Sequence, residues 1–459
     1  MATAARKLVL EPQRSPLDAV SEAGYLARGL SATLAVKLTT LGLSFVTLIV
    51  LSRLLGPQGY GQYAYVMATV AILTPLAAVG MPSIVVREVA ACRARGDYAR
   101  LKGVVAFAFM AAVLSFLGLS LIYGLLHMLA AAWSTRAGDH PLLTLALLLL
   151  AILAGLFSAI QQGLKRIVAA QVPFAIVQPL LMVLLLLLAW WAWRHPVHVE
   201  DAILLAALAG ALALSVAIAL TRHTWRHTRP RGPSGWRFDA RRWTAAGFSL
   251  AILGLLGTLN GQADIVLLRW LAGTEATGIF HVASRNAHLV TLLLGALIAP
   301  LGPLVAELHA KGDRAALQRV VRRSIRVVFL LTLPAALVMI AAGELYLGLF
   351  GEGFAAGHAA LGILALAQLV NVAAGPVQML LVMTGHQARI IPALSWSLLA
   401  NIVLNLALIP RLGATGAACA TAFSIVLWNV ALSLEVRRHL GIDASVLGRP
   451  QRTIAEARL

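Results

Sequence analysis

The sequence predicts an all-α polytopic membrane protein with about 12 transmembrane helices, built as two parallel-repeat six-helix bundles. Three observations carry this prediction: the apolar composition, the alternation of basic and neutral loops, and an internal repeat. Apolar residues make up 60% of the 459-residue chain and charged residues only 12%. A water-soluble protein of that composition would expose large aggregating patches. We therefore expect the chain to lie in a bilayer.

Apolar stretches of the length that a bilayer requires, roughly 20 residues, recur along the whole sequence. The expected spans are 32–52, 61–82, 103–127, 141–163, 169–193, 201–221, 244–268, 276–303, 327–347, 359–384, 390–409 and 413–435. A short turn at Lys165 and Arg166 separates the fourth from the fifth. The expected divisions are an N-terminal tail (1–31), an N-terminal lobe (32–221), a basic linker (222–243), a C-terminal lobe (244–435) and a C-terminal tail (436–459).

The basic residues fall on one side of this topology. Of the 37 Lys and Arg residues, 30 lie in the two tails and in the loops after even-numbered spans, five lie in the other six loops, and two lie within spans. This distribution follows the positive-inside rule and places both termini in the cytoplasm. The net charge of +19 is therefore a topology signal, and we expect no nucleic-acid partner. The linker is interpreted as a solvated connection; contact with anionic headgroups is the alternative.

An internal repeat relates the two halves. Residues 49–53 (IVLSR) match 265–269 (IVLLR), and 94–97 (ARGD) match 310–313 (AKGD). Further matches at the same offset of 216 or 217 residues pair 55–56 with 272–273 and 61–63 with 278–280. Because the offset spans six helices, both copies have the same orientation, and the repeats are related by an axis along the membrane normal. Transporters of this construction carry their substrate path between the lobes.

Several stretches resemble a known family. Residues 51–65 (LSRLLGPQGYGQYAY), the turn at 80–82 and the segment 87–97 (REVAACRARGD) are similar to the first two spans and the first cytoplasmic loop of polysaccharide exporters. Residues 349–354 (LFGEGF) and 400–422 (ANIVLNLALIPRLGATGAACATA) resemble later segments of the same group. These exporters are the lipid-linked oligosaccharide flippases of the multidrug/oligosaccharidyl-lipid/polysaccharide superfamily.

The resemblance implies two bundles that alternate between inward- and outward-facing states. It also implies a function: translocation of undecaprenyl-pyrophosphate-linked repeat units across the bacterial cytoplasmic (inner) membrane for O-antigen, lipopolysaccharide or exopolysaccharide biosynthesis. A polysaccharide polymerase and chain-length machinery are the implied protein partners, beside membrane lipids. Lipid II flippases usually carry two more spans than the twelve expected here, which disfavours that assignment.

Three charged residues are expected inside the bilayer: Lys37, Asp264 and Arg285. Insertion of each charge into the bilayer costs about 2.5–3.5 kcal/mol, so we expect each to have a functional or structural role. His281 and His288 stand at i−4 and i+3 from Arg285, on one helix face. That face is a candidate substrate-binding surface for a phosphate or an acidic sugar, because a guanidinium offers a planar fork of donors. The alternative is a structural ion pair between Arg285 and Asp264.

The other two charges also leave alternatives open. Lys37 is a candidate substrate-binding residue that meets pyrophosphate, or else extends its side chain to the interface. Asp264 is a candidate for coupling to H⁺ or Na⁺, with Asn260 on the same face at i−4. Such asparagines also hydrogen-bond neighbouring helices. We expect no cofactor other than such a coupling ion, and no metal site.

Aromatic side chains gather near the predicted span boundaries. Tyr60, Tyr63 and Tyr65 surround the start of the second span. This placement is typical of the aromatic belt that anchors helices at the interface.

Two other function classes compete with the flippase. A drug or cation antiporter of the multidrug and toxic compound extrusion branch needs buried acids, whereas the intramembrane charges here sum to +1. A membrane enzyme is not expected, because the predicted extracytoplasmic loops are short and no phosphate-binding G-x-x-x-x-G-K-[ST] motif or nucleophile–base set is present. We therefore expect a non-enzymatic transporter of an anionic, lipid-linked substrate.

Overall fold

The computed structural model describes residues 16–133, 140–192, 196–227 and 235–448, and within these ranges the chain is helical and contains no strand. The predicted N-terminal tail, linker and C-terminal tail fall partly outside these ranges. The principal helices are α1 (Pro16–Ala78), α2 (Met81–Arg95), α3 (Tyr98–Trp133), α4 (Pro141–Gly163), α5 (Ile167–Val172), α6 (Gln178–Ala192), α7 (Val199–His227), α8 (Ala240–Leu271), α9 (Gly273–Ala287), α10 (Leu292–Ala310), α11 (Arg314–Ala341), α12 (Gly343–Gly348), α13 (His358–Ala374), α14 (Val377–Met383) and α15 (Ile390–Leu440). Shorter turns of π- or 3₁₀-helix are η1 (Pro173–Val177), η2 (His288–Thr291), η3 (Phe354–Gly357) and η4 (Gln387–Arg389).

The helices are long and apolar enough for twelve membrane spans. Among the described residues nine helices pass this test, and a tenth span is formed by 273–298 and 300–310, which meet at a bend of 50°. Two of the nine are double-length, because α1 is broken at Gly56 and α15 at Gly413. Counting both halves of these two gives twelve spans, and the predicted fold class is confirmed. The turn predicted at Lys165 lies between α4 and α5.

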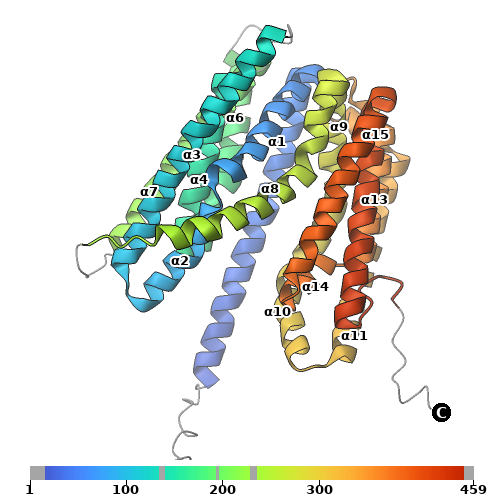
Figure 1. The fold of residues 1–459 in the computed structure, drawn as a ribbon. Helices are drawn as coiled ribbons and strands as arrows, with labels where there is room; N and C mark the ends of the chain where they lie inside the picture. The colour runs from blue at the N-terminus through green and yellow to red at the C-terminus, as the bar shows by residue number, and fades with distance from the viewer. Residues whose placement is uncertain (1–15, 134–139, 193–195, 228–234, 449–459) are drawn as a thin grey trace, which may run out of the picture.

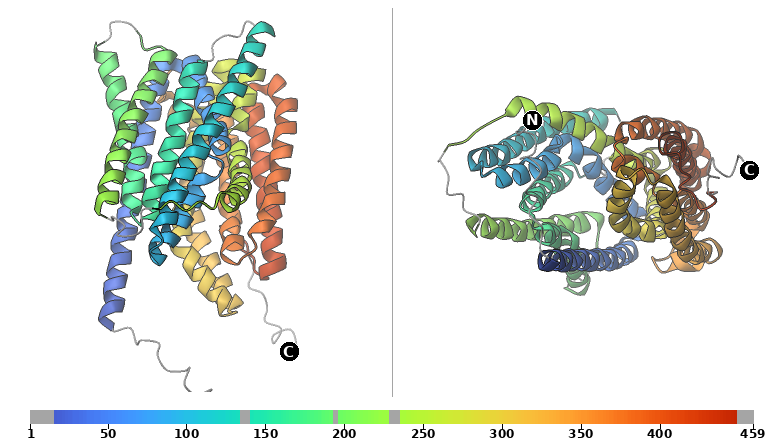
Figure 2. Two further views of the ribbon diagram at one scale, coloured as in Figure 1. Left: turned by 60° about the vertical axis from the view of Figure 1, so that its left-hand side comes forward. Right: turned by 90° about the horizontal axis from the view of Figure 1, so that it is seen from below.

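The spans form two groups of helices (Figures 1 and 2). One group contains α1 to α7, which we call the N lobe, and the other contains α8 to α15, which we call the C lobe. α1 also packs against α8 and α9, so it lies at the boundary between the lobes, and α8 crosses from α2 to α15. α1 begins and α15 ends at the same end of the bundle (Figure 1), which we call the terminal end. Gly56 lies at the opposite end.

The internal repeat is present in the backbone. Gly56 and Gly273, one repeat apart, both have positive φ, 65° and 88°, where each breaks the chain between two spans. Gly96 and Gly312 also correspond, with φ of 70° and 71° after α2 and α10. Only glycine adopts such angles without steric cost. The matches found in the sequence therefore mark equivalent turns of the two halves.

The two lobes touch closely at the opposite end, through paired glycines. A Cβ atom on Gly61 would lie 1.8 Å from the Thr274 carbonyl oxygen, and one on Gly278 would lie 2.0 Å from the Pro57 oxygen. Thr274 and Gly278 are the repeat counterparts of Pro57 and Gly61, so each lobe presents the same motif to the other. We call this contact the glycine crossing. No side chain larger than hydrogen fits at either glycine.

At the terminal end, the segment after α15 is fastened to the C lobe. The Asp443 carboxylate accepts hydrogen bonds from Arg437 at 2.7 Å and from the Ser445 hydroxyl at 2.7 Å. The Gln318 side chain on α11 accepts from the Asp443 backbone N–H at 2.6 Å. Further along, the Val446 N–H donates to the Ala373 carbonyl at the end of α13. These bonds therefore fasten the segment to α11 and α13.

Substituting Asp443 with alanine should lower the stability of the C lobe. Each lost hydrogen bond contributes about 0.5–1.5 kcal/mol, or more where the partner is charged, so we expect the apparent Tm of the purified protein to fall by about 2–6 °C. The matched control is Glu352→Ala, which removes an exposed carboxylate. Equal melting temperatures for D443A and E352A would contradict this assignment.

Candidate functional site

A cavity of about 520 Å³ lies between the lobes and is lined by residues of α1, α6, α8, α9, η2 and α10. We call it the central cavity. Its lining residues are Leu41, Ser44, Phe45, Thr47, Leu48, Leu51, Tyr60, Tyr63, Ala64, Met67, Ala68, Ala71, Pro179, Gln262, His281, Arg285, Asn286, His288, Leu289 and Leu292. This described lining contains one guanidinium and no carboxylate. The wall of the central cavity is therefore positively charged.

Arg285 is held in place by a short chain of hydrogen bonds. Its Nε donates to His281 Nε2 at 3.4 Å, and His281 Nδ1 lies 2.8 Å from the Tyr60 hydroxyl. Because Nε2 accepts from arginine, the imidazole is neutral and carries its proton on Nδ1, which donates to Tyr60. No described residue binds the two Nη groups of Arg285, whose side chain is exposed to the cavity. His281 thus orients Arg285 and leaves the forked edge of the guanidinium available for an anion.

Tyr60 is buried, not interfacial. Only 2% of its surface is exposed, and Tyr65 is 8% exposed. The prediction that both anchor the chain in the aromatic belt is wrong. The reason is that α1 folds back at Gly56, so the first turns of its second half pack against α9. The sequence signal for tyrosines at a span boundary does not distinguish a lipid-facing side from one that faces the other lobe.

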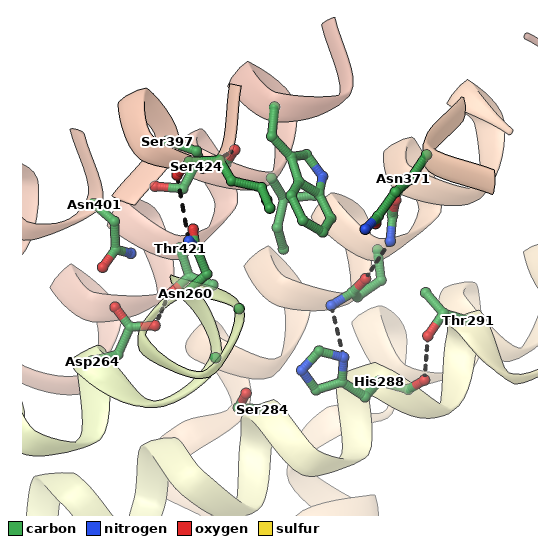
Figure 3. Close-up of a pocket in the computed structure, with 17 residues that line it drawn as sticks. Asn260, Asp264, Ser284, His288, Thr291, Asn371, Ser397, Asn401, Thr421 and Ser424 are labelled. Carbon is green, nitrogen blue, oxygen red and sulfur yellow. Dashed lines mark hydrogen bonds between the residues drawn. The ribbon is translucent and has the colours of Figure 1, made fainter. Parts of the chain in front are cut away.

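His288 is positioned by a relay of amides on α13 and α15. Asn429 Nδ2 donates to the Ile425 carbonyl and to Asn371 Oδ1, at 2.8 and 3.1 Å. Asn371 Nδ2 then donates to Gln368 Oε1 at 3.2 Å, and Gln368 Nε2 lies 3.1 Å from His288 Nδ1. We call these three amides the amide relay; its last bonds are drawn in Figure 3.

The direction of the amide relay fixes the His288 tautomer. A backbone carbonyl can only accept, so the Asn429 amide has one orientation, and each following amide is oriented in turn. Gln368 therefore donates to His288 Nδ1, and the ring proton lies on Nε2. His288 is thereby a neutral donor, and it lines both the central cavity and a second cavity in the C lobe.

The second cavity, of about 350 Å³, lies within the C lobe, and we call it the C-lobe chamber. Asp264 lies on its wall and is 4% exposed. Its carboxylate accepts hydrogen bonds from Asn405 at 2.6 Å and from Thr421 at 2.8 Å, both on α15. Figure 3 shows Asp264 beside Thr421 and apart from His288. The ion pair with Arg285 that the sequence left open is not formed, because the two charges line different cavities.

Asn260 and Lys37 occupy different surroundings. Asn260 lines the C-lobe chamber and donates to the carbonyls of Leu256 and Leu394, at 2.9 and 3.4 Å, so it links α8 to α15. Lys37 is exposed on α1, one turn before Leu41 and on the same face. It lies about 6 Å along the helix axis from the nearest lining residue of the central cavity, and no described residue forms an ion pair with it. It does not line the cavity.

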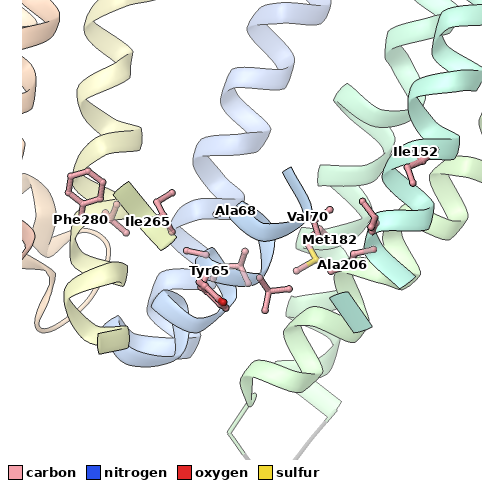
Figure 4. Close-up of a cluster of buried hydrophobic side chains, with 14 of the residues drawn as sticks. Tyr65, Ala68, Val70, Ile152, Met182, Ala206, Ile265 and Phe280 are labelled. Carbon is pink, nitrogen blue, oxygen red and sulfur yellow. The ribbon is translucent and has the colours of Figure 1, made fainter. Parts of the chain in front are cut away.

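An apolar core supports the cavity walls. Buried side chains run without interruption from Ile152, Met182 and Ala206 in the N lobe, through Tyr65 and Val70 of α1, to Ile265 and Phe280 of α8 and α9 (Figure 4). Burial of each large apolar side chain contributes about 1.5–3 kcal/mol. The elements that carry Tyr60 and Arg285 are thus held together by packing across the lobe boundary.

Comparison with known proteins agrees with this architecture. The sequence profile of a family described as polysaccharide biosynthesis protein matches residues 26–309, more than half of the chain. The chain belongs to this family. Two relatives from the archaeon Haloferax volcanii are similar: probable flippase AglR (27% identical over 192 residues, 40% of each chain) and probable low-salt glycan biosynthesis flippase Agl15 (28% identical over 178 residues, 38% of this chain and 37% of the relative). The chain thus matches about two fifths of the length of these relatives.

Solved structures confirm the fold of this family member. An inward-facing multidrug resistance MATE transporter of the MOP superfamily superposes with a TM-score of 0.69 at 12% identity, over 87% of this chain and 94% of that one. Lipid II flippase MurJ in an inward closed conformation gives 0.64 at 13% identity, over 88% and 87%. A MOP superfamily transporter from Pyrococcus furiosus gives 0.61 at 13% identity, over 90% and 94%. These TM-scores show a shared fold, and the protein is a multi-pass membrane protein.

Proposed function

We propose that the protein is a flippase that moves a lipid-linked oligosaccharide across the membrane by alternating access. The observation that carries the proposal is the central cavity, where an oriented Arg285 offers its Nη groups and the described lining holds no carboxylate. The pyrophosphate that joins lipid to sugar carries one negative charge on each phosphate, and this dianion suits the fork of donors on Arg285. The family and the flippase relatives support the same substrate class.

The carrier, the membrane and the cargo are proposed from the sequence resemblance. We propose undecaprenyl pyrophosphate as the carrier, the bacterial inner membrane as the location, cytoplasmic termini, and O-antigen or exopolysaccharide repeat units as the cargo. Lys37 would meet the approaching headgroup outside the central cavity. Both curated relatives are archaeal, so the carrier and the membrane rest on the resemblance and on the basic loops, and a polymerase and chain-length machinery remain proposed partners.

The test is transport in vesicles. A fluorescent polyprenyl-pyrophosphate oligosaccharide is placed in liposomes with the purified protein, and the fraction accessible to an external glycosidase is followed over time. We expect faster equilibration between leaflets than in protein-free liposomes. A protein that moves a cationic dye but not this lipid would be an antiporter of the multidrug branch, the alternative that the shared fold also permits.

We propose further that Asp264 binds the coupling ion, H⁺ or Na⁺. The carboxylate is buried without a basic partner among the described residues, and Asn405 Oδ1 beside it is buried without a hydrogen bond. Carboxylate, amide and hydroxyl oxygens are the ligands that a hard cation prefers. Rotation of the Asn405 amide would turn its oxygen toward a cation between the two side chains. The residues therefore fit a monovalent cation.

Asp264→Asn should uncouple transport from the ion gradient. It keeps the shape of the side chain but removes the negative charge that attracts the ion, so we expect the acceleration of flipping by an imposed Na⁺ or H⁺ gradient to fall about tenfold or more. The matched control is Glu344→Gln, the same change at an exposed position on α12. Full gradient dependence in D264N would remove Asp264 from the coupling mechanism.

A further inference from the structure

The C-lobe chamber has an unusual lining for the interior of a membrane-spanning bundle. Buried polar groups are costly there unless they are bonded. Its amide and hydroxyl residues are Asn260, Gln368, Asn371, Gln378, Asn401, Ser284, Thr291, Ser397, Thr421 and Ser424. The described lining contains no lysine or arginine, and its one carboxylate, Asp264, is already bonded by Asn405 and Thr421. The chamber is therefore polar, and Asp264 is the only acidic residue of its described lining.

Some of these polar groups are left without a protein partner. The Gln378 side chain is exposed to the chamber, and no described residue hydrogen-bonds it. Gln378 is in the first turn of α14, which begins after the chain breaks at Gly375, where φ is +85°. Asn260 uses its Nδ2 for backbone carbonyls, while no described residue binds its Oδ1. One amide with donors and acceptors and a second acceptor thus remain available to a ligand.

The chamber and the central cavity share His288 as a wall residue. This residue lines both spaces, three residues after Arg285 and in the 3₁₀ turn η2. The amide relay fixes it as a neutral Nε2–H donor. A ligand whose phosphates lie at Arg285 would therefore reach the chamber on the other side of His288. The central cavity thus has the Arg285 cation in its wall, whereas the chamber has amides, hydroxyls and the Asp264 carboxylate.

The size and chemistry of the chamber select the ligand class. Its volume of about 350 Å³ is at the lower end of the range of about 300–1,000 Å³ for small-molecule sites, so it suits one small ring system and not a whole oligosaccharide. Neutral amides and hydroxyls both donate and accept, as the hydroxyl groups of a sugar require. Trp428 adds an aromatic ring to the wall, which an apolar face of a ring can contact.

We propose that the C-lobe chamber is a neutral carbohydrate subsite, which holds the sugar joined directly to the pyrophosphate of the lipid-linked substrate. The proposal rests on the proposed flippase function and adds to it a place where the glycan is recognised. Gln378 and Asn260 bind hydroxyl groups of that sugar, and His288 donates at the passage between the phosphates and the ring. Sugars farther along the chain remain in the central cavity.

The test compares two dianionic probes that differ only in the group on the terminal phosphate: geranylgeranyl pyrophosphate capped with a methyl ester, and the same lipid pyrophosphate carrying one glucose. Binding to the purified full-length protein in nanodiscs is measured for the wild type, Gln378→Leu and Gln387→Leu. Gln387 is exposed on η4, outside the chamber lining, and supplies a matched control. We expect Q378L to weaken the glucosylated probe about tenfold, as the loss of a hydrogen bond to a hydroxyl does, and to leave the sugar-free probe within twofold. Q387L should change neither.

Each other result overturns a specific claim. If the wild type binds both probes equally, or if Q378L leaves the glucosylated probe unaffected while it folds normally by size-exclusion chromatography, the carbohydrate subsite is wrong and the flippase proposal stands. If the wild type binds neither probe, the flippase proposal fails and this inference fails with it. Should Q378L misfold, Gln378→Met is used instead, and equal effects on both probes would refute the subsite.

Discussion

Arg285→Ala is expected to abolish translocation of the lipid-linked substrate while leaving the protein abundant in the membrane. The guanidinium is the only cation in the described lining of the central cavity, and its Nη groups are free to bind a phosphate. Each charge-assisted hydrogen bond contributes about 1.5–3 kcal/mol, so the loss of a two-bonded fork should reduce transport at least about 100-fold. Stability should change little, because Arg285 makes no ion pair with a described residue.

Two companion variants make this result specific. Arg285→Lys keeps the charge but loses the planar fork and the Nε bond to His281, so we expect intermediate transport. Arg389→Ala removes an exposed arginine on η4 outside both cavities and should behave as the wild type. The measurements are flipping in liposomes and surface glycan in a strain that lacks its own flippase. Wild-type flipping by R285A at normal abundance would show that the cationic wall does not bind the cargo.

Gly61→Val is expected to stop transport by preventing the lobes from closing at the opposite end. A Cβ on Gly61 would lie 1.8 Å from the Thr274 carbonyl oxygen, far inside contact distance, and backbone cannot move aside without separating α1 from α9. Alternating access requires this end to close in one half of the cycle. We therefore expect flipping to fall more than about tenfold, since packed interfaces tolerate overpacking poorly. Gly278→Val should have the same effect.

Labelling can distinguish a blocked closure from general misfolding. In a Ser44→Cys variant that also lacks Cys419, a maleimide that cannot cross the membrane is added on the side opposite the termini. We expect labelling of Ser44→Cys to increase when Gly61→Val is present. Cys92 can stay, because it is buried and burial raises the pKa of its thiol. The control is Gly42→Val on the same helix, where an added Cβ meets nothing within 4 Å. Unchanged labelling and transport in G61V would refute a closing role for the glycine crossing.

The fold was accessible to sequence reasoning because its causes are local or periodic. Span length, loop charge and the repeat offset each depend on residues read in order along the chain. The repeat even placed equivalent glycines, such as Gly96 and Gly312, whose backbone angles agree. The spacing of His281, Arg285 and His288 likewise identified one helix face, and the structure places all three on the wall of the central cavity.

The hydrogen-bond partners that give these residues their different roles could not be predicted in the same way. His281 orients Arg285 because its other ring nitrogen is bonded to Tyr60 of the other lobe, which is 221 residues away in sequence. His288 depends on the amide relay, whose members lie on α13 and α15. Asp264 is bonded by Thr421, 157 residues later. These pairings arise from tertiary packing, for which a single sequence gives no distance information, and the change from α-helix to 3₁₀-helix at His288 rotates that side chain relative to an ideal helix.

The glycine crossing also bears on how such a chain can arise. Each half contributes a pair of residues four positions apart, Pro57 with Gly61 and Thr274 with Gly278. Gly61 lies against the Thr274 carbonyl, and Gly278 lies against the Pro57 carbonyl. An interface of this kind is isologous, the type that a two-fold homodimer makes. A six-span ancestor that paired with a second copy of itself would already have had the glycine crossing. Fusion of two genes would then have needed only the connecting segment between α7 and α8.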